Sequence, residues 1–574
     1  MTLSVLGARL VQLQGLDAGE LAADAANQRD RSITLYAPRG SITDRNGVPL
    51  ATSVSARLIA ADPMEAAPRD PARDGACKGK AGSEYVACSA AALAPLLGKP
   101  APELQRKLTV NPERPRNRYV ELARGIPPSA GRKIAELGLA GIGARPDSKR
   151  VYPQGALGAQ LLGLTREGKG ELGFERWRDE HLSGRNGELV AELDAQGRII
   201  PSAEHHERPA VPGRDLRLTI DRDLQWRAQA AIAAQVQKSG ALDGTIIVMS
   251  PKTGEILAMA TAPTFDPSDP RTVKDPNASV KGVVDAYEPG SVNKVITAAA
   301  ALEVGGLTPD TAFTVPDTYS AAGETFHDSE SHPVQRLTLT GVIAKSSNVG
   351  TILASKSLSD QQIYDYLRKF GFGAKTGIGL PGEQAGALPK PSLWSASSRY
   401  TIPFGQGVSA NALQIASVYA TVANGGVRRT PRIVAAETDD SGRLVPRPAP
   451  PGQRVIQKQT AEQLSMMLEA VTGDEGTAKT LRIPGYRVAG KTGTAQRYDE
   501  ETKGYSGYSS SFVGYAPADN PELVVAVVVQ KPRNGYYGAA VAGPAFRDVM
   551  QFGLLSRGIA PSGTEAPDPK IFAP

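Results

Sequence analysis

Three short segments of the sequence carry side chains that could act together on an acyl group. In chain order they are Ser291-Val292-Asn293-Lys294, Ser346-Ser347-Asn348 and Lys491-Thr492-Gly493-Thr494. Each is common on its own, because a serine after Pro-Gly often caps a helix and Lys-Thr-Gly often forms a turn. In this order, with Ser291 opening a helix and the Lys491 segment within a strand, they indicate one site built around a serine.

The first segment places a nucleophile and a base within reach of each other. Ser291 and Lys294 are about one helical turn apart, so both side chains lie on one face. A serine hydroxyl is a poor nucleophile until a base removes its proton. Lysine can be that base only when neutral, and its ordinary pKa of about 10.4 must therefore fall. Burial would lower this pKa, and so would a second cation, for which Lys491 is the candidate.

The second segment suits proton transfer and orientation. Ser346 could relay a proton between Lys294 and a leaving amine, and the amide of Asn348 could orient Lys294 and hold substrate backbone. A Ser-His-Asp site is the alternative, but we interpret the histidines as ordinary surface residues. His327 or His332 could still line the site. The histidines before the linker at 209–214 are His181, His205 and His206, and those between Ser291 and Ser346 are His327 and His332.

The third segment suits substrate binding. Lys491 and Thr492 could hold a carboxylate, and their strand could pair with an extended peptide. The oxyanion of a tetrahedral intermediate needs fixed donors, for which the backbone N–H groups of Ser291 and Thr494 are candidates. The predicted substrate-binding residues are Ser347, Thr492, Gly493 and Thr494.

The elements that must position these segments follow a change of composition at residues 209–214, where Pro209, Pro212 and Gly213 mark a linker. Predicted strands span residues 215–220, 244–250, 255–262, 486–496, 509–514 and 523–529. Predicted helices follow Ser291 and span residues 222–237, 337–344, 411–424, 460–471 and 545–555. Helices beside a sheet built from hairpins predict an α+β fold, with an antiparallel sheet flanked by helices.

The residues before this linker predict a different kind of structure. An exposed helix is expected over 16–31, a strand over 33–36 and a hairpin turn at Asn46-Gly47. Residues 62–146 mix short helices with loops, as a binding platform would. Residues 3–11 are mostly apolar but contain Arg9, and spanning a bilayer takes about 20 apolar residues.

Composition narrows the class of protein. Hydrophobic residues make up 41% of the chain and charged residues 22%, which is ordinary for water-soluble globular domains. The net charge of +6 is spread over the chain without a basic block, which argues against nucleic acid as a partner. It would still suit a polyanionic polymer.

At these residues the sequence resembles the class B penicillin-binding proteins, and among them the division-specific peptidoglycan transpeptidases. The three segments correspond to the motif set shared with class A β-lactamases, which carry Asp where Ser347 stands. Ser346 follows Ser291 at a spacing similar to the family's. Further similar stretches are Tyr287-Glu288-Pro289-Gly290, Phe404-Gly405-Gln406-Gly407, Ala420 to Gly426, Arg39-Gly40, Asp44-Arg45-Asn46-Gly47, Arg150, Tyr152-Pro153, Gly170, Gly173 and Glu175. Val292-Asn293 departs from the Thr-Phe of many relatives.

The resemblance implies an enzyme without metal or organic cofactor that is acylated by the penultimate D-alanine of a stem peptide. It then passes the acyl group to an amine on a neighbouring strand. The implied partners are peptidoglycan stem peptides, glycan strands made from lipid-linked precursors, β-lactam antibiotics, a polytopic glycosyltransferase and other division proteins. The implied place is the outer side of the cell membrane, anchored by one N-terminal helix that this chain lacks.

The resemblance and the composition together predict the domains. These are a juxtamembrane segment over 1–31, an elongated mixed α/β pedestal over 32–213, a transpeptidase domain over 214–558 and a disordered tail over 559–574. Cys77 and Cys88 are too few for a metal site and could be reduced thiols or one disulfide. An extracytoplasmic place favours the disulfide.

Three alternatives stay open. An elongation-specific transpeptidase of the same family would carry the same motifs. A β-lactamase would share the acylation step but needs a base for fast deacylation, and it would have little use for a pedestal. A non-catalytic scaffold for wall assembly could lose its nucleophile without penalty, whereas Ser291, Lys294 and their partners are intact.

Overall fold

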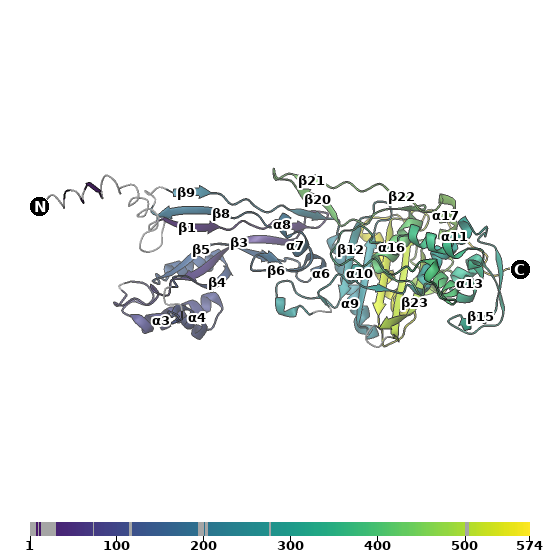
Figure 1. Cartoon of the computed structure of the whole chain (residues 1–574), viewed down its shortest axis with the longest axis horizontal. Coiled ribbons are helices and arrows are strands. Elements are labelled where there is room, and N and C mark those ends of the chain that lie inside the picture. Colours follow the sequence, from purple (N-terminus) through teal and green to yellow (C-terminus); the bar gives the residue numbers. More distant parts are fainter. Residues whose placement is uncertain are drawn as a thin grey trace. The chain divides into compact units, whose positions relative to one another are not determined.

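A computed structural model describes residues 7, 9, 11–12, 30–72, 74–113, 117–192, 200, 205–274, 277–499 and 504–574 (Figure 1). The chain forms two compact units, each assembled from separate pieces of sequence. The first consists of Met1–Ser41, Ala51–Val151 and Glu180–Asp215, and the second of Ile42–Leu50, Tyr152–Asp179 and Leu216–Pro574. Two pieces that precede the predicted linker thus pack with the second unit, which our division into consecutive segments did not foresee.

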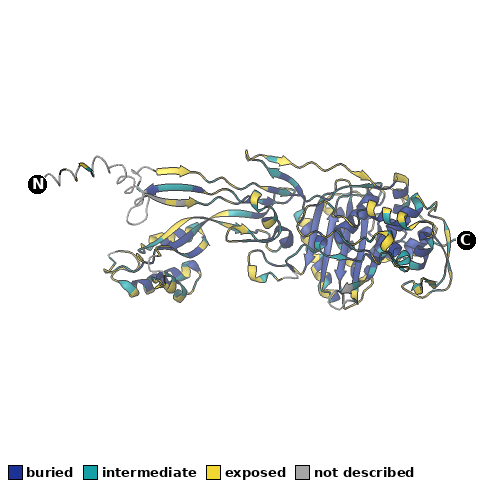
Figure 2. Cartoon of the chain, in the orientation of Figure 1, coloured by how far each residue is buried: buried dark blue, intermediate teal, exposed yellow. Residues whose placement is uncertain are grey.

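The second unit is built on a five-stranded antiparallel sheet. Its order is β12 (Ile256–Ala262), β11 (Asp243–Met249), β25 (Leu523–Gln530), β24 (Gly504–Ala516) and β23 (Ala489–Asp499). Every residue of β11, β12 and β25 is buried, so helices must cover both faces of the sheet. Figure 2 shows the strands of this sheet coloured mostly as buried. The predicted α+β class is confirmed.

Helices with well-formed ends cover this sheet. Helix α9 (Arg222–Ser239) begins where the Asp221 carboxylate accepts from two backbone N–H groups, and ends at Gly240 in the left-handed conformation. It packs against β12 and against α19 (Gly543–Ser556). Helix α16 (Ala412–Ala423) opens with a capping box between Asn411 and Gln414, and is buried along its whole length against β24 and β25.

A second group of helices carries the first two motifs. It comprises α11 (Lys294–Glu303), α12 (Leu339–Ala344), α13 (Asn348–Ser355), α14 (Asp360–Lys369) and α17 (Lys458–Glu469). Helix α11 contacts α13, α14 and α17, and α17 contacts β23. The helices that carry the first two motifs are thus packed together with β23, which carries the third.

Two sequence predictions in this unit are corrected. The helix expected from residue 337 begins only at residue 339, because residues 335–338 form β17 (Gln335–Thr338), paired with β14 (Ala312–Val315). The tail expected to be disordered continues this pairing, since Leu337 bridges to Phe572. The Ile571 carbonyl accepts from the Thr338 N–H at 3.0 Å, so backbone hydrogen bonding orders the proline-rich segment.

The first unit contains two sheets. In one, β3 (Pro49–Ala61) pairs with β4 (Val120–Ile126) and β5 (Ile142–Val151). Helices α3 (Gly82–Leu97), α4 (Ala101–Leu108) and α5 (Pro128–Glu136) share a core with it. The other sheet has the order β1 (Asp30–Leu35), β8 (Gly187–Glu192), β9 (His205–Arg208).

Cys77 and Cys88 lie beside the core of the first unit and are joined as a disulfide. Predictions for residues 13–29, including most of the helix over 16–31, fall outside the described residues. Among the described residues, we find no helix with the length and apolar character needed to cross a membrane.

Candidate active site

Ser291 lies on a short 3-10 turn, Gly290–Asn293, that leads into α11. Gly290 has a φ of +59°, and its N–H donates to the Gly405 carbonyl at 3.0 Å. Gly405, with a φ of +90°, approaches so closely that a Cβ there would lie 2.2 Å from the Gly290 carbonyl oxygen. Only glycine meets both demands, which explains the Gly residues of the Pro-Gly-Ser and Phe-Gly-Gln-Gly stretches.

Buried hydrogen bonds fix the rest of this turn. The Tyr419 hydroxyl donates to the Val292 carbonyl at 2.9 Å, and the Asn293 amide donates to the Ile402 carbonyl at 3.0 Å. Val292 and Asn293 are buried, whereas Ser291 is half-buried. The departure at Val292-Asn293 therefore concerns packing beneath the turn, and the serine remains accessible.

Lys294 joins the first motif to the second. Its side chain is fully buried, and Nζ donates to the Ser346 carbonyl at 2.5 Å and to Asn348 Oδ1 at 2.7 Å. The Ser346 hydroxyl lies 3.4 Å from the same nitrogen. Burial lowers the pKa of Lys294 to about 7, although the negative charge of Asp328 opposes this shift. A large fraction of the amine is thus neutral near neutral pH.

The second motif occupies the junction between α12 and α13. Ser346 has a φ of +61°, an uncommon conformation for a residue with a side chain, and this turns its carbonyl toward Lys294. Ser347 is buried, and its hydroxyl caps α13 by accepting from the Gly350 N–H at 2.8 Å. The predicted substrate contact through Ser347 is therefore corrected to a capping role.

The third motif lies on β23, the last strand of the sheet. Lys491 to Thr494 pair in regular register with Val513 to Ser510 of β24. A Cβ on Gly493 would lie 3.0 Å from Val292 Cγ1 and 3.2 Å from the Pro289 carbonyl oxygen. The strand thus runs directly against the turn that carries Ser291, and the glycine permits this approach.

Lys491 is also fully buried, and burial, followed by repulsion from Lys294, lowers its pKa well below the usual value. From the sequence we expected burial and this repulsion together to lower the pKa of Lys294. Burial is the cause that lowers the pKa of Lys294 in the structure. Lys491 Nζ donates to the carbonyl and hydroxyl of Thr492, each at 3.3 Å.

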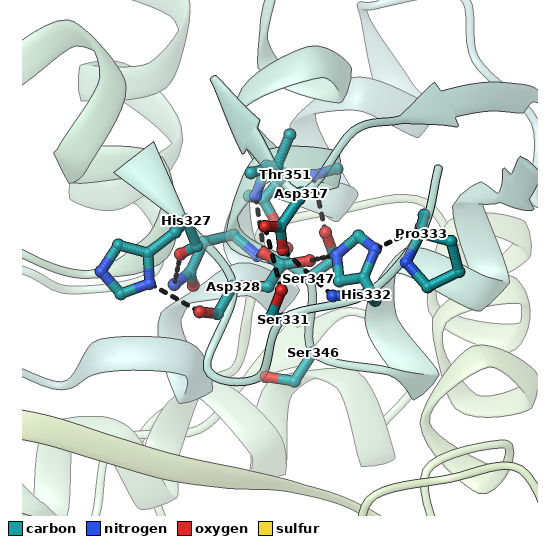
Figure 3. A network of polar contacts seen from close by, with 12 residues as sticks. Asp317, His327, Asp328, Ser331, His332, Pro333, Ser346, Ser347 and Thr351 are labelled. Atoms are coloured by element: carbon teal, nitrogen blue, oxygen red, sulfur yellow. Dashed lines mark hydrogen bonds and ion pairs between the residues drawn. The ribbon is translucent and has the colours of Figure 1, made fainter. Parts of the chain in front are cut away.

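Asp328 is a site residue that sequence reasoning missed. Its carboxylate accepts from the backbone N–H groups of Asn348 at 2.5 Å and Val349 at 3.0 Å. Figure 3 shows Asp317, Asp328 and His332 gathered beside Ser347. Asp328 is one of several acidic residues in the polar loop between the first two motifs, so the sequence does not single it out.

The histidines divide between the two units. His205 and His206 are exposed on β9 of the first unit. The His327 carbonyl accepts from Asn348 Nδ2 at 3.0 Å, and His332 Nε2 lies 3.1 Å from Asp328 Oδ2. The side chain of His332 is only 13% exposed, so the interpretation as an ordinary surface residue was wrong for it.

The comparisons with known families agree with this geometry. The Penicillin binding protein transpeptidase domain matches residues 244–551, and the Penicillin-binding Protein dimerisation domain matches residues 34–218. The chain therefore belongs to the penicillin-binding protein transpeptidase family, as its three motifs predicted.

Within that family the chain is similar over its whole length to curated penicillin-binding proteins and peptidoglycan D,D-transpeptidases. The penicillin-binding protein PbpB of Mycolicibacterium smegmatis is 35% identical over 99% of this chain and 90% of its own length. The peptidoglycan D,D-transpeptidase FtsI of Escherichia coli is 32% identical over 100% and 92%. The crystal structure of penicillin-binding protein 3 from Mycobacterium tuberculosis with ampicillin is 31% identical, with a TM-score of 0.71, covering 94% of this chain and 100% of that chain.

Proposed function

We propose that this chain, a peptidoglycan D,D-transpeptidase of the penicillin-binding protein family, forms its acyl-enzyme on Ser291 with Lys294 as the base. One observation carries the proposal. The Lys294 amine is fully buried and hydrogen-bonded to both Ser346 and Asn348, and burial brings its pKa to about 7. Such an amine can accept the Ser291 proton near neutral pH.

The acylation step follows from these positions. Ser291 Oγ attacks the carbonyl carbon of the penultimate D-alanine while its proton passes to neutral Lys294. The backbone N–H groups of Ser291 and Thr494 donate to the oxyanion of the tetrahedral intermediate. When the intermediate collapses, the peptide bond breaks, and the terminal D-alanine amine leaves with a proton relayed from Lys294 through Ser346. An amine of a neighbouring stem peptide then attacks the acyl-serine and regenerates the hydroxyl.

β23 is the element that would hold the substrate. Its edge away from β24 pairs with no strand among the described residues, so an extended stem peptide can add there as a further strand. The Thr492 hydroxyl would bind the substrate carboxylate, Lys491 would orient that hydroxyl through its hydrogen bond, and Gly493 would contribute backbone groups. A β-lactam antibiotic would use the same contacts and acylate the same serine.

We further propose that the enzyme cross-links stem peptides on glycan strands at the division septum, with both units outside the cell membrane. The support is full-length similarity to PbpB and FtsI. The partners would be a polytopic glycosyltransferase and other division proteins. An elongation-specific role would leave the same chemistry at Ser291.

The test is the intact mass of the protein after brief exposure to benzylpenicillin. The native chain and the control Ser441→Ala, in an exposed turn, should gain one adduct, and Ser291→Ala should gain none. Slow loss of the adduct distinguishes a transpeptidase from a β-lactamase, which would release it within the mixing time. An unmodified native chain, folded by circular dichroism, would refute the assignment.

A further inference from the structure

The residues between the first two motifs form a loop that is hydrogen-bonded to the second motif. β15 (Thr318–Ala321) and β16 (Glu324–His327) make a hairpin, and the chain then turns through Asp328 to His332 before β17. The backbone N–H and both side-chain polar atoms of Asn348 form hydrogen bonds with this loop or with Lys294. Its backbone N–H donates to Asp328, its Nδ2 donates to the His327 carbonyl, and its Oδ1 accepts from Lys294.

The Asp328 carboxylate is nearly enclosed, with its side chain 11% exposed. One of its oxygens, Oδ1, accepts both N–H groups at the start of α13, and the other, Oδ2, faces His332 Nε2 at 3.1 Å. A negative charge at this end of a helix is favourable, because the N–H groups point toward it. Asp328 therefore both fixes the backbone at the start of α13, where Asn348 lies, and places a negative charge there.

His332 lies against this carboxylate, and a protonated ring would support its charge. Its Nδ1 lies 2.7 Å from the Pro333 carbonyl oxygen while Nε2 faces Asp328, so both ring nitrogens have acceptors and both can donate only when the ring is charged. Partial burial opposes that charge, but the Pro333 carbonyl, Asp328 and Asp317 outweigh it and raise the pKa of His332. Asp317 also accepts from the His332 backbone and from Ser331 (Figure 3).

Aromatic contacts hold the hairpin from the side of the Ser291 turn. The Tyr400 ring lies 6.0 Å from Tyr319 and 5.7 Å from Phe326, measured between ring centroids. Phe326 also meets Phe404 edge-on at 6.4 Å. Phe404 precedes Gly405, the residue whose carbonyl accepts from Gly290, so one loop is anchored beside the first motif and bonded to the second.

We propose that Asp328 is a positioning residue for acyl transfer: its carboxylate fixes the start of α13, and thereby Asn348, and supplies the negative charge that faces Lys294. This inference rests on the proposed role of Lys294 as the base. Asp328 touches neither the nucleophile nor the substrate, and it acts through Asn348 and through its field.

The charge has a measurable consequence. Burial lowers the pKa of Lys294 to about 7, and Asp328 is the charge that raises it. The other titratable groups on the elements around this pair are Lys491 from β23, His332 and His327 from the loop, and Asp317 behind His332. Since protonated Lys294 cannot accept the serine proton, the acid limb of the acylation profile follows the pKa of Lys294. Without the Asp328 charge, that limb should move to lower pH.

The experiment measures the rate constant for acylation by benzylpenicillin from pH 5 to pH 9. In Asp328→Asn the amide oxygen can still accept both backbone N–H groups, so acylation should persist at pH 8 within about 10-fold, with the acid limb lowered by about one pH unit. Asp328→Ala removes the cap as well and should acylate about 10- to 100-fold more slowly. The control is Asp439→Asn, an aspartate that caps an unrelated turn through the N–H groups of Ser441 and Arg443.

Either of two outcomes overturns the inference. One is a folded Asp328→Asn chain whose acid limb coincides with that of the native chain. The other is a folded Asp328→Asn chain with no adduct at any pH, because its retained backbone bonds should preserve acylation. A penicillin adduct on the native chain, absent from Ser291→Ala, would leave the proposed function standing in both cases. Should Asp328→Ala fail to fold, the asparagine variant alone decides.

Discussion

The second motif contacts the buried Lys294 and the third contains the buried Lys491, but the two motifs are held in place by different means. Lys491 to Thr494 lie within a strand whose neighbours repeat a regular register, so the backbone of β24 fixes every residue in turn. Ser346 to Asn348 lie at a helix junction where one residue has a φ of +61° and side chains of a loop supply the restraints. The strand motif thus depends on sheet pairing, and the junction motif on a few particular groups.

This difference predicts how each motif fails. A strand motif should tolerate side-chain changes that leave its pairing intact. It should lose function when a clash displaces the strand backbone. A junction held by single hydrogen bonds should lose function in proportion to each bond removed. Substitutions that separate these two behaviours test the comparison.

The largest effect is expected from Gly538→Ala, because the added methyl group would clash with the backbone of β23 and β24. A Cβ there would lie 2.4 Å from the Gly493 carbonyl oxygen and 2.3 Å from that of Ser511, so we expect the backbone at this contact, the third motif included, to shift. Displacement of the third motif by about 1 Å should slow acylation by at least about 100-fold. Gly563→Ala, where a Cβ meets nothing within 4 Å, is the control for acylation and melting temperature. Equal acylation in both variants would contradict the account.

Asn348→Ala should have a smaller effect, because it removes single bonds from the junction. Lys294 loses the acceptor at 2.7 Å and keeps the Ser346 carbonyl. A hydrogen bond to a charged group is worth about 1.5–3 kcal/mol, so acylation should slow by roughly 10- to 100-fold. Stopped-flow measurement with a fluorescent penicillin checks this, with the exposed Asn520→Ala as control. Undiminished acylation would show that the Ser346 carbonyl alone positions the lysine.

The buried lysine also makes stability depend on pH. The pKa of Lys294 is about 7 in the folded chain and about 10.4 when unfolded, so between these values the unfolded chain binds more protons and stability rises with pH. Lys294→Met should therefore lose part of the rise in melting temperature between pH 7 and pH 9. The exposed Lys252→Met should retain the native slope. A native slope in Lys294→Met would show that Lys294 is charged when folded.

The smallest effect is expected at the C-terminal segment that pairs with β17. Phe572 lies beneath the Lys345 ammonium, with Nζ 5.5 Å from the ring centroid, and Lys345 directly precedes the second motif. Phe572→Ala should cost about 0.5–1 kcal/mol of stability and slow acylation only a few-fold. Leu555→Ala, which removes an exposed side chain elsewhere, is the control. A 100-fold loss of acylation would mean that this segment governs the junction directly.

The same contrast explains what the sequence could predict. The strands of the sheet were found within a few residues of their true ends, except that β24 begins earlier, because apolar runs between turn residues are local signals. The order of the three motifs then predicted one site. Asp328 was missed because its contact with Asn348 crosses a loop, and no periodicity marks such a contact.

Two other errors have a similar origin. Strands β15 and β16 are short, exposed in large part and mostly polar, and β14 has only four residues, so none shows an alternation long enough to be recognised. The tail is rich in proline, which favours disorder, yet Ile571 and Phe572 find a partner in β17. Composition describes a segment by itself, whereas strand pairing depends on what another part of the chain leaves available.

Ser346 carries a cost that bears on how the protein can change over generations. A left-handed backbone is unfavourable by about 1–2 kcal/mol for a residue with a side chain, and glycine would avoid it. Ser346→Gly would thus yield a more heat-stable chain that lacks the proposed proton relay. Selection for stability and selection for catalysis act in opposite directions at this one position. A library of variants screened only for heat resistance should therefore enrich glycine here, and its survivors would fold well without cross-linking anything.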